Sequence, residues 1–174
     1  DHANLKAHAD SRGVLFLSTP FDEESADLLD ALGVPAFKIA SSDITHVPLL
    51  RHVAAKGKPI ILSTGMSFLS EVADAISVLG SAGADEIVLM HCVSSYPAPP
   101  ESLNLRAIQT LRNCFDLPVG YSDHSQGILL PLAAVALGAV VLEKHFTLDK
   151  RADGPDHKLS MNPEELKTLI ESIR

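Results

Sequence analysis

The sequence predicts an α/β fold built of consecutive βα units, the arrangement of a (β/α)8 TIM barrel, here incomplete. Short apolar, strand-like runs alternate with helix-like segments, and each repeat takes roughly 20–30 residues, as expected for parallel strands joined by helices. The runs are apolar on both faces, which is typical of strands covered by helices. Each run ends in polar or ionisable residues, and the carboxyl ends of barrel strands form the active-site face. We therefore expect part of an enzyme.

The predicted elements follow one another in regular order. Strands are expected at residues 14–19, 36–43, 59–65, 86–95, 118–124 and 139–145. Helices are expected at residues 23–32, 47–56, 70–82, 102–113, 127–137 and 163–173. The first three helices stop at Gly33, Gly57 and Gly83, because glycine is the usual residue just past a helix end. The last helix begins with Asn162 as a capping residue and Pro163 at the first helical position.

The number of units predicts a barrel that is not closed. Six units are two short of eight, and barrels typically need about 250 residues, or roughly 200 at the least. An open doubly wound sheet is the alternative, but no GxGxxG sequence follows a strand and opens a helix. Candidate ligand residues also close nearly every strand, which favours a barrel mouth over one switch point. We therefore expect residues 1–174 to form one partial catalytic barrel domain that starts at the third strand or its preceding helix.

Composition excludes several classes of protein. A formal net charge of −8 and a pI near 5.4 argue against a nucleic-acid partner, which needs a basic face. Two cysteines do not make a disulfide framework, and we expect both as reduced, partly buried thiols. The apolar run 128–142 is shorter than a membrane span and is interrupted by Pro131 and Gly138. The first residues lack a secretory pattern, so the expected location is cytoplasmic, away from membranes.

Two histidines form a candidate metal site. His124 and His145 close the tripeptides Ser122-Asp123-His124 and Glu143-Lys144-His145 at the ends of adjacent predicted strands, which brings the two imidazoles near each other. Such a pair suits Mn²⁺, Zn²⁺ or Fe²⁺, with water and substrate in the remaining positions. Two hydrogen-bonded structural histidines are the alternative, and spacing alone leaves both interpretations open.

A lysine and four hydroxyl residues form a candidate phosphate site. Lys38 lies inside an otherwise apolar strand, where a lysine is costly to bury unless it meets an anion. It could hold a phosphate or form a Schiff base. Thr19, Ser41, Ser63 and Ser122 recur at comparable depths on four strand ends and could complete a phosphate cradle. Alternatively, each of these serine and threonine residues, taken singly, only marks the end of a strand and binds no ligand.

Three further positions are ambiguous from sequence alone. Asp156 follows the last strand in a polar loop, where a carboxylate can reach a polyol, although the segment by itself is typical of a turn. Tyr96, with Pro97 after it, is equally typical of a turn. We expect His91 to be structural rather than a third metal ligand.

Nine strings match a known family in order: STPF (18–21), PAFKIAS (35–41), GKPIILSTGM (57–66), HCVSSYP (91–97), NLRAI (104–108), GYSDH (120–124), AAVALGA (133–139), LEKHFT (142–147) and GPDH (154–157). Together they resemble the N-acetylneuraminate (sialic acid) synthase family over essentially the whole chain. The resemblance implies a (β/α)8 barrel that condenses phosphoenolpyruvate with N-acetylmannosamine and releases phosphate, giving N-acetylneuraminate. It also implies a divalent metal, Mn²⁺ or Mg²⁺.

The resemblance also implies a role for each matching residue. The metal ligands would be His124 and His145. Phosphoenolpyruvate would be held by a lysine and four hydroxyl residues: Thr19, Lys38, Ser41, Ser63 and Ser122. Tyr96 and Asp156 would contact the sugar, Ser94 would line the pocket, and Asp43 would supply an acidic group near the reacting carbons. The metal would polarise the sugar aldehyde for attack by the enol carbon. Water would then add to the resulting cation, and phosphate would leave by C–O cleavage.

The sequence departs from the family pattern in several ways. The family's first two strands and its small C-terminal antifreeze-like domain have no counterpart, so we expect the chain to be a piece of a longer synthase, homodimeric at full length. Ser42 stands where glycine is expected, which alters the backbone approach to a ligand. His46 stands where asparagine is usual, and we expect a local exchange of hydrogen bonds there.

Three other functions compete with this one. A synthase of a related nonulosonic acid, such as legionaminic or pseudaminic acid, would share the same barrel core. An aldolase would use Lys38 as a Schiff base. A non-catalytic scaffold would assemble through exposed strand edges without binding metal or phosphoenolpyruvate.

Overall fold

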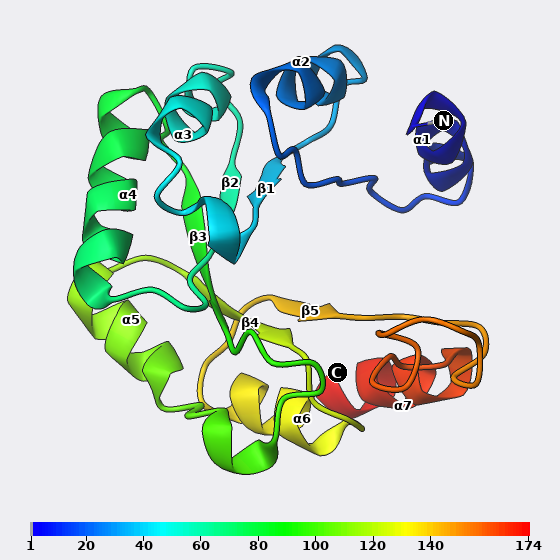
Figure 1. The fold of residues 1–174 in the computed structure, drawn as a ribbon. Helices are drawn as coiled ribbons and strands as arrows, with labels where there is room; N and C mark the ends of the chain where they lie inside the picture. The colour runs from blue at the N-terminus through cyan, green and yellow to red at the C-terminus, as the bar shows by residue number, and fades with distance from the viewer. Residues whose placement is uncertain (1) are drawn as a thin grey trace. The chain divides into compact units, whose positions relative to one another are not determined.

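The protein is described by a computed structural model in which residues 2–174 are placed (Figure 1). Five strands, all parallel where their pairing is resolved, follow one another in the sheet in chain order. They are β1 (Phe37–Ile39), β2 (Ile60–Ser63), β3 (Ile87–Cys92), β4 (Val119–Asp123) and β5 (Leu142–Lys144). The α-helices are α1 (His2–Ser11), α2 (Glu23–Ala31), α3 (Val47–Ala54), α4 (Leu69–Ser81), α5 (Ala107–Phe115), α6 (Leu129–Ala136) and α7 (Pro163–Ile173). This succession is that of (β/α)8-barrel units, so the predicted fold class, an incomplete barrel, is confirmed.

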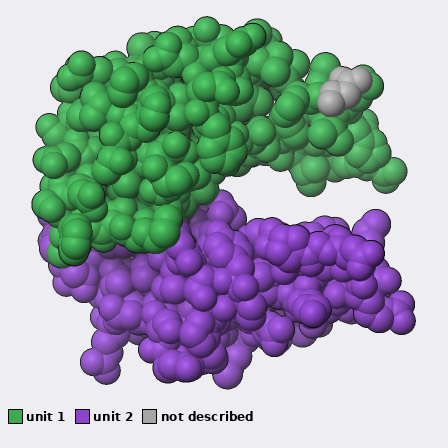
Figure 2. Space-filling model, in the orientation of Figure 1, with its two compact units in different colours: residues 1–88 green, residues 89–174 purple. Residues whose placement is uncertain are grey.

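The chain divides into two compact units, one ending at Val88 and the other beginning at Leu89 (Figure 2). The boundary falls inside β3. Each unit has its own buried residues.

The first unit is organised around the parallel pair β1–β2. Phe37 pairs with Ile60 and Ile39 with Leu62, and all four side chains are fully buried. The helix α3 packs against both α2 and α4. This helix begins where His46 Nδ1 accepts a hydrogen bond from the Leu49 amide at 3.1 Å. His46 thus serves as the N-cap of this helix, while the expected exchange of hydrogen bonds with an asparagine stays a prediction.

The second unit contains the three-stranded run β3–β4–β5. Leu89 pairs with Val119 across β3 and β4, and Tyr121 pairs with Leu142 across β4 and β5. Gly120 makes the close approach possible, because a Cβ there would lie 2.5 Å from Met90 Sδ and 2.7 Å from the Val141 carbonyl oxygen. The carboxyl ends of β4 and β5 are thereby held side by side.

One predicted strand is absent. Residues 14–20 form no strand, and Val14 and Leu15 are 58% and 79% exposed. A strand exists only where its backbone pairs with a neighbour, and these residues make no ladder in the described chain. The apolar run therefore reflects β propensity, but the segment has no neighbouring strand to pair with in the described chain.

The helix predicted at 102–113 is displaced. A short 3₁₀ helix, Pro100–Ser102, comes first, and α5 begins only at Ala107. Asn104 has a left-handed φ of 40°, which an α-helix cannot contain. The predicted helix stops are correct, since Gly33, Gly57 and Gly83 all have positive φ. At α7, Asn162 and Glu165 form the expected cap by exchanging hydrogen bonds.

Two smaller expectations have mixed outcomes. Both cysteines are free. Cys92 is buried, and Cys114 in α5 is exposed rather than partly buried. Among residues 2–174, no helix has the length and apolar character needed to cross a membrane.

Candidate functional site

The first unit carries a cluster of polar groups at the carboxyl ends of β1 and β2. Lys38 lies opposite Ile61 in the ladder, and Ser63 is two residues further along β2, so the two side chains share a face. Lys38 Nζ donates to Ser63 Oγ at 2.8 Å and lies 3.5 Å from the Ile39 carbonyl oxygen. The half-buried ammonium of Lys38 is thus held by the serine hydroxyl.

Ser41 belongs to the same cluster through the backbone. Its Oγ accepts a hydrogen bond from the Gly65 amide at 3.0 Å, which ties the residue after β1 to the turn after β2. Ser41 also opens the 3₁₀ helix Ser41–Asp43, where the half-buried Asp43 accepts from Ser42 Oγ at 3.2 Å. An ammonium, two hydroxyls and a backbone amide gathered in this way suit an anion such as a phosphate or a carboxylate.

Thr19 stands apart from these contacts. It is half-buried in the segment before α2, where the predicted strand does not form. In the described part of the chain, hydrogen bonds join Lys38 to Ser63 and Ser41 to Gly65.

The second unit carries the two histidines at the ends of β4 and β5. In the ladder Ser122 pairs with Glu143 and Asp123 with Lys144, so His124 and His145 come one step further along both strands. Their ring centroids are 5.3 Å apart, at 62° to each other. Adjacent strand ends therefore bring the imidazoles together as the sequence predicts.

His124 is prepared to act as a ligand. Its Nδ1 lies 2.7 Å from the Val93 carbonyl oxygen, which can only accept, so Nδ1 carries the proton and Nε2 keeps its lone pair. Burial lowers the pKa of His124, and the neighbouring His145 lowers it further, against the opposing effect of the Val93 hydrogen bond. The neutral imidazole, the form that binds metals, is thereby favoured.

Tyr96 covers the histidine pair. Its ring stacks on His124 with centroids 4.1 Å apart and meets His145 edge-on at 5.7 Å. The side chain is 51% exposed. Burial raises the pKa of Tyr96, and the nearby carboxylates of Asp156 and Glu143 add to the effect. The phenol therefore keeps its proton and can donate it to a polar ligand.

Asp156 is brought to the same place from the loop after β5. Its Oδ2 lies 3.7 Å from His145 Nδ1. The loop is anchored at Asp156 itself, whose carbonyl oxygen accepts from Ser160 Oγ at 2.8 Å. Ser94 is half-buried in the segment that leads from β3 to Tyr96. The second unit thus joins His124, His145, Tyr96 and Asp156 in one group.

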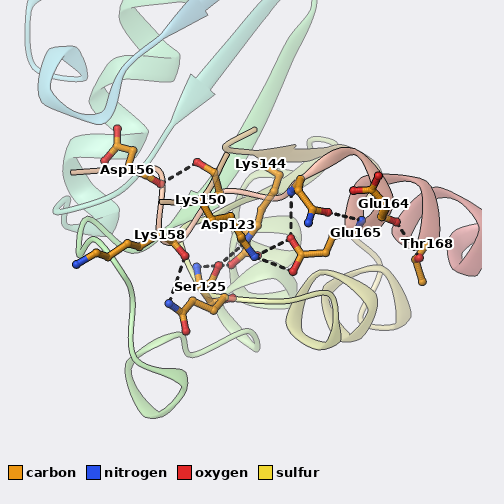
Figure 3. A network of polar contacts seen from close by, with 12 residues as sticks. Asp123, Ser125, Lys144, Lys150, Asp156, Lys158, Glu164, Glu165 and Thr168 are labelled. Carbon is orange, nitrogen blue, oxygen red and sulfur yellow. Dashed lines mark hydrogen bonds and ion pairs between the residues drawn. The ribbon is translucent and has the colours of Figure 1, made fainter. Parts of the chain in front are cut away.

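Two pairings in this unit were not predicted. Ser122 is buried, and its Oγ donates to Glu143 Oε1 at 2.7 Å. Asp123 and Lys144 form a buried ion pair at 2.6 Å on the other face of the strands (Figure 3). The signal was present in the sequence, because the tripeptides ending in His124 and His145 align residue by residue: serine with glutamate, aspartate with lysine, histidine with histidine.

The histidine pair fits a divalent metal ion. It offers two imidazole rings, one with a fixed tautomer, in a partly buried setting. Among residues 2–174 no third histidine, cysteine, aspartate or glutamate joins them in a ligand cluster. A metal held here would take its other ligands from water or substrate, as in catalytic sites with open positions. His91 is not part of this group, since its Nε2 hydrogen-bonds the Leu103 carbonyl oxygen at 2.7 Å.

Comparison with known proteins shows what this chain is similar to. A family model described as the NeuB family matches residues 1–174. An uncharacterized protein of Methanocaldococcus jannaschii is 56% identical over 98% of this chain and 50% of its own length. An N,N'-diacetyllegionaminic acid synthase of Campylobacter jejuni is 54% identical over 99% of this chain and 52% of its own. The chain thus spans about half the length of the curated relatives it matches.

A solved structure is similar over the same extent. The N-acetylneuraminic acid (sialic acid) synthetase of Leptospira borgpetersenii, crystallised with citrate, matches 98% of this chain and 60% of its own, with a TM-score of 0.95 and 42% identity. The family model covers the entire sequence, and the fold agrees with that of the Leptospira protein. The chain therefore belongs to the NeuB family.

Proposed function

We propose that the chain is the barrel part of a synthase that condenses phosphoenolpyruvate with an N-acetylated amino sugar to give a nonulosonic acid and phosphate. The observation that carries the proposal is the His124–His145 pair, capped by Tyr96 and bordered by Asp156. A sugar aldehyde needs a Lewis acid and polar groups for its hydroxyls, and this group offers places for both. Membership of the NeuB family supports the same reaction class.

The cluster of the first unit is assigned the task of holding phosphoenolpyruvate. Lys38 and Ser63 already form a hydrogen-bonded donor pair, and Ser41 stands beside the Gly65 amide. These groups would take the phosphate or carboxylate oxygens, with the hydroxyl of Thr19 as a further donor. Asp43 would hold the proton released when water adds to the reacting cation.

The group of the second unit is assigned the sugar. When bound, a divalent metal such as Mn²⁺ or Mg²⁺ would supply Lewis-acid polarisation of the aldehyde. His124 and His145 would hold that metal, with His124 kept in the correct tautomer by Val93. The Tyr96 phenol would donate to a sugar oxygen, the Asp156 carboxylate would accept from a sugar hydroxyl, and Ser94 would line the pocket.

Two sugars are candidates. N-acetylmannosamine, giving N-acetylneuraminate, is supported by the 42% identity to the Leptospira sialic acid synthetase. A diacetamido sugar, giving N,N'-diacetyllegionaminate, is supported by the 54% identity to the Campylobacter enzyme. The higher identity favours the second, and the reacting centre is the same in both.

The remaining assignments concern the whole protein. We regard residues 1–174 as one partial catalytic domain of a longer polypeptide, acting in the cytoplasm as a homodimer. The scaffold alternative has no comparable support, because a scaffold needs neither the paired histidines nor the Lys38–Ser63 contact.

The test is calorimetric titration of phosphoenolpyruvate into the chain, with and without Mn²⁺. The informative variant is Lys38→Met. The matched control is Lys56→Met, which removes a lysine of the same unit that pairs with Asp27. Binding lost in the first variant and kept in the second supports the proposal. A folded wild-type chain that binds no phosphoenolpyruvate contradicts it.

The Schiff-base alternative has its own experiment. Borohydride is added to the chain with pyruvate, and the mass of the protein is measured. An adduct that is absent from Lys38→Met would identify an aldolase. An unmodified mass removes that alternative and leaves Lys38 as an anion-binding group.

A further inference from the structure

The buried pair Asp123–Lys144 lies directly behind the two histidines. Asp123 and Lys144 face each other in the β4–β5 ladder, and each is followed by a histidine. Successive side chains of a strand point to opposite faces, so the ion pair occupies one face and the histidines the other. The ladder geometry therefore links the placement of the pair to the placement of both rings.

The carboxylate of Asp123 spans the backbone around His124. Its Oδ1 accepts from Tyr121 Oη at 3.0 Å and from the Ser125 amide at 2.9 Å, and its Oδ2 accepts from Lys144 Nζ at 2.6 Å. Residues on both sides of His124 are thus fastened to one carboxylate. The Asp123 side chain is 1% exposed, so the whole arrangement is shielded from water.

Lys144 fastens the same segment from the second strand. Its Nζ donates to the Ser125 carbonyl oxygen as well as to Asp123, and its side chain is 6% exposed. Lys144 immediately precedes His145, so one ammonium connects the residue before His145 to the residues on either side of His124. Figure 3 shows Asp123, Lys144 and Ser125 converging in this way.

A buried ion pair is a poor source of stability, because the cost of removing two charges from water offsets their attraction. Its better-attested use is to specify register. A slip of one residue between β4 and β5 would place Asp123 against Glu143 or against His145 and leave Lys144 without its acceptors. The pair therefore selects the one register in which His124 and His145 lie side by side.

We infer that Asp123 and Lys144 are positioning residues that set the spacing of His124 and His145 through their buried ion pair. The inference deepens the proposed function, because it rests on the histidine pair as the metal site of that function. Neither residue touches metal or substrate in this role. Their effect is on the relative position of the two imidazole rings.

The experiment compares two double variants of the chain. Asp123→Asn with Lys144→Met removes both charges but keeps an acceptor for Tyr121 and Ser125 and a similar volume. Glu171→Gln with Lys167→Met makes the same chemical change at the exposed pair on α7. The readout in metal-free protein is nuclear magnetic resonance: the imidazole ¹H–¹⁵N signals and the nuclear Overhauser effect between the His124 and His145 rings.

We expect the first double variant to stay folded by circular dichroism and to lose at least about half of the ring-to-ring effect, whereas the control keeps it. Its Mn²⁺ affinity, measured by electron paramagnetic resonance of the free ion, should fall about 10–100-fold, the range for residues that orient ligands. If the first double variant does not fold, Asp123→Asn alone gives the same readout. Unchanged ring signals in the folded variant overturn the inference.

The two proposals fail in different ways. A wild-type chain that binds no Mn²⁺ contradicts the metal role in the proposed function, while the ring signals of metal-free protein still decide the positioning role. Conversely, unaltered ring signals with intact Mn²⁺ binding reject the positioning role and leave the proposed function in place.

Discussion

The Nδ1 atom of His124 lies 2.7 Å from the carbonyl oxygen of Val93, the residue that directly follows β3. This contact joins the end of one strand to the end of its neighbour and fixes which ring nitrogen carries the proton. A backbone carbonyl that holds an imidazole in this way is a common feature around metal-binding histidines. Because only Nδ1 makes this contact, a mutation can test the role of Nδ1 separately from that of Nε2.

Replacement of His124 by Asn should abolish metal binding while keeping the fold. The Asn amide nitrogen can occupy the place of Nδ1 and still donate to Val93, but nothing replaces Nε2. We expect Mn²⁺ affinity to fall at least about 100-fold, beyond the 10–100-fold typical of residues that only orient a ligand. Electron paramagnetic resonance measures the affinity, and thermal unfolding checks the fold. Full affinity in a folded His124→Asn chain would exclude Nε2 as a ligand.

Replacement of Tyr96 by Phe should separate sugar binding from metal binding. The ring still stacks on His124, so Mn²⁺ affinity is expected to stay within about 2-fold. Loss of the Tyr96 hydroxyl should weaken sugar binding by about 1 kcal/mol, roughly 5-fold, which is the scale of one hydrogen bond. Calorimetric titration of each candidate sugar into the chain with Mn²⁺ measures the affinity. An affinity that does not change would show that the hydroxyl makes no contact with the sugar.

Two glycine substitutions should change stability in opposite directions. At Gly120, an added methyl meets the Val141 carbonyl oxygen at 2.7 Å, and backbone cannot move aside as a side chain can. We expect Gly120→Ala to lower the free energy of unfolding by about 1–3 kcal/mol through overpacking. Gly80 lies inside α4 with open space around it, so Gly80→Ala should stabilise by about 0.5–1 kcal/mol.

Urea unfolding of the two variants beside the wild-type chain tests this pair. The same chemical change is made in both, so the difference isolates the close approach of β4 to its neighbours. Equal effects at the two positions would mean that the strands can separate without cost at Gly120.

Stability should decrease as the pH falls below neutrality, in part because of His91. Burial lowers the pKa of His91 below its ordinary value of 6.5, more than the Leu103 hydrogen bond raises it. Between the two pKa values, His91 is therefore protonated in the unfolded chain and neutral in the folded chain. The contribution of His91 to the free energy of unfolding is fully present above pH 6.5 and is lost as the pH falls from there toward the pKa of the folded chain.

The slope of unfolding free energy with pH measures this effect. His91→Gln keeps a donor for the Leu103 carbonyl oxygen but cannot ionise, and it should reduce the slope by up to about 1.4 kcal/mol per pH unit. His124 acts in the same direction, so the slope is reduced rather than abolished. An identical slope in wild type and variant would show that His91 titrates alike in the folded and unfolded chains.

The fold was predictable at positions where the local backbone conformation strongly favours one residue type. Glycines with positive φ end α2, α3 and α4 as expected, and five apolar runs became strands. The run at 14–19 failed because propensity reports what a backbone can do and not whether a partner is available. Asn104 moved the start of α5, because a single left-handed residue overrides the helical pattern around it.

The proximity of some candidate site residues was predictable from the sequence, but their side-chain pairings were not. Strand-end positions correctly placed His124 beside His145 and Lys38 beside Ser63. Burial of Ser122 against Glu143 depends on which residue faces which across two strands, and that register is a tertiary property. Thr19 was predicted to lie level with the other hydroxyl residues at the strand ends, and that prediction relied on a strand at residues 14–19 that is absent from the described chain.

The stacking of Tyr96 on His124 has a spectroscopic consequence. The protein contains no tryptophan and two tyrosines, so its intrinsic ultraviolet emission comes from Tyr96 and Tyr121 alone. Tyr121 is buried and hydrogen-bonded to the Asp123 carboxylate, whereas Tyr96 is half-exposed and stacks on the His124 imidazole. The molecule therefore carries an intrinsic optical reporter: the fluorescence of Tyr96 should change when a ligand binds to His124, the ring on which it stacks.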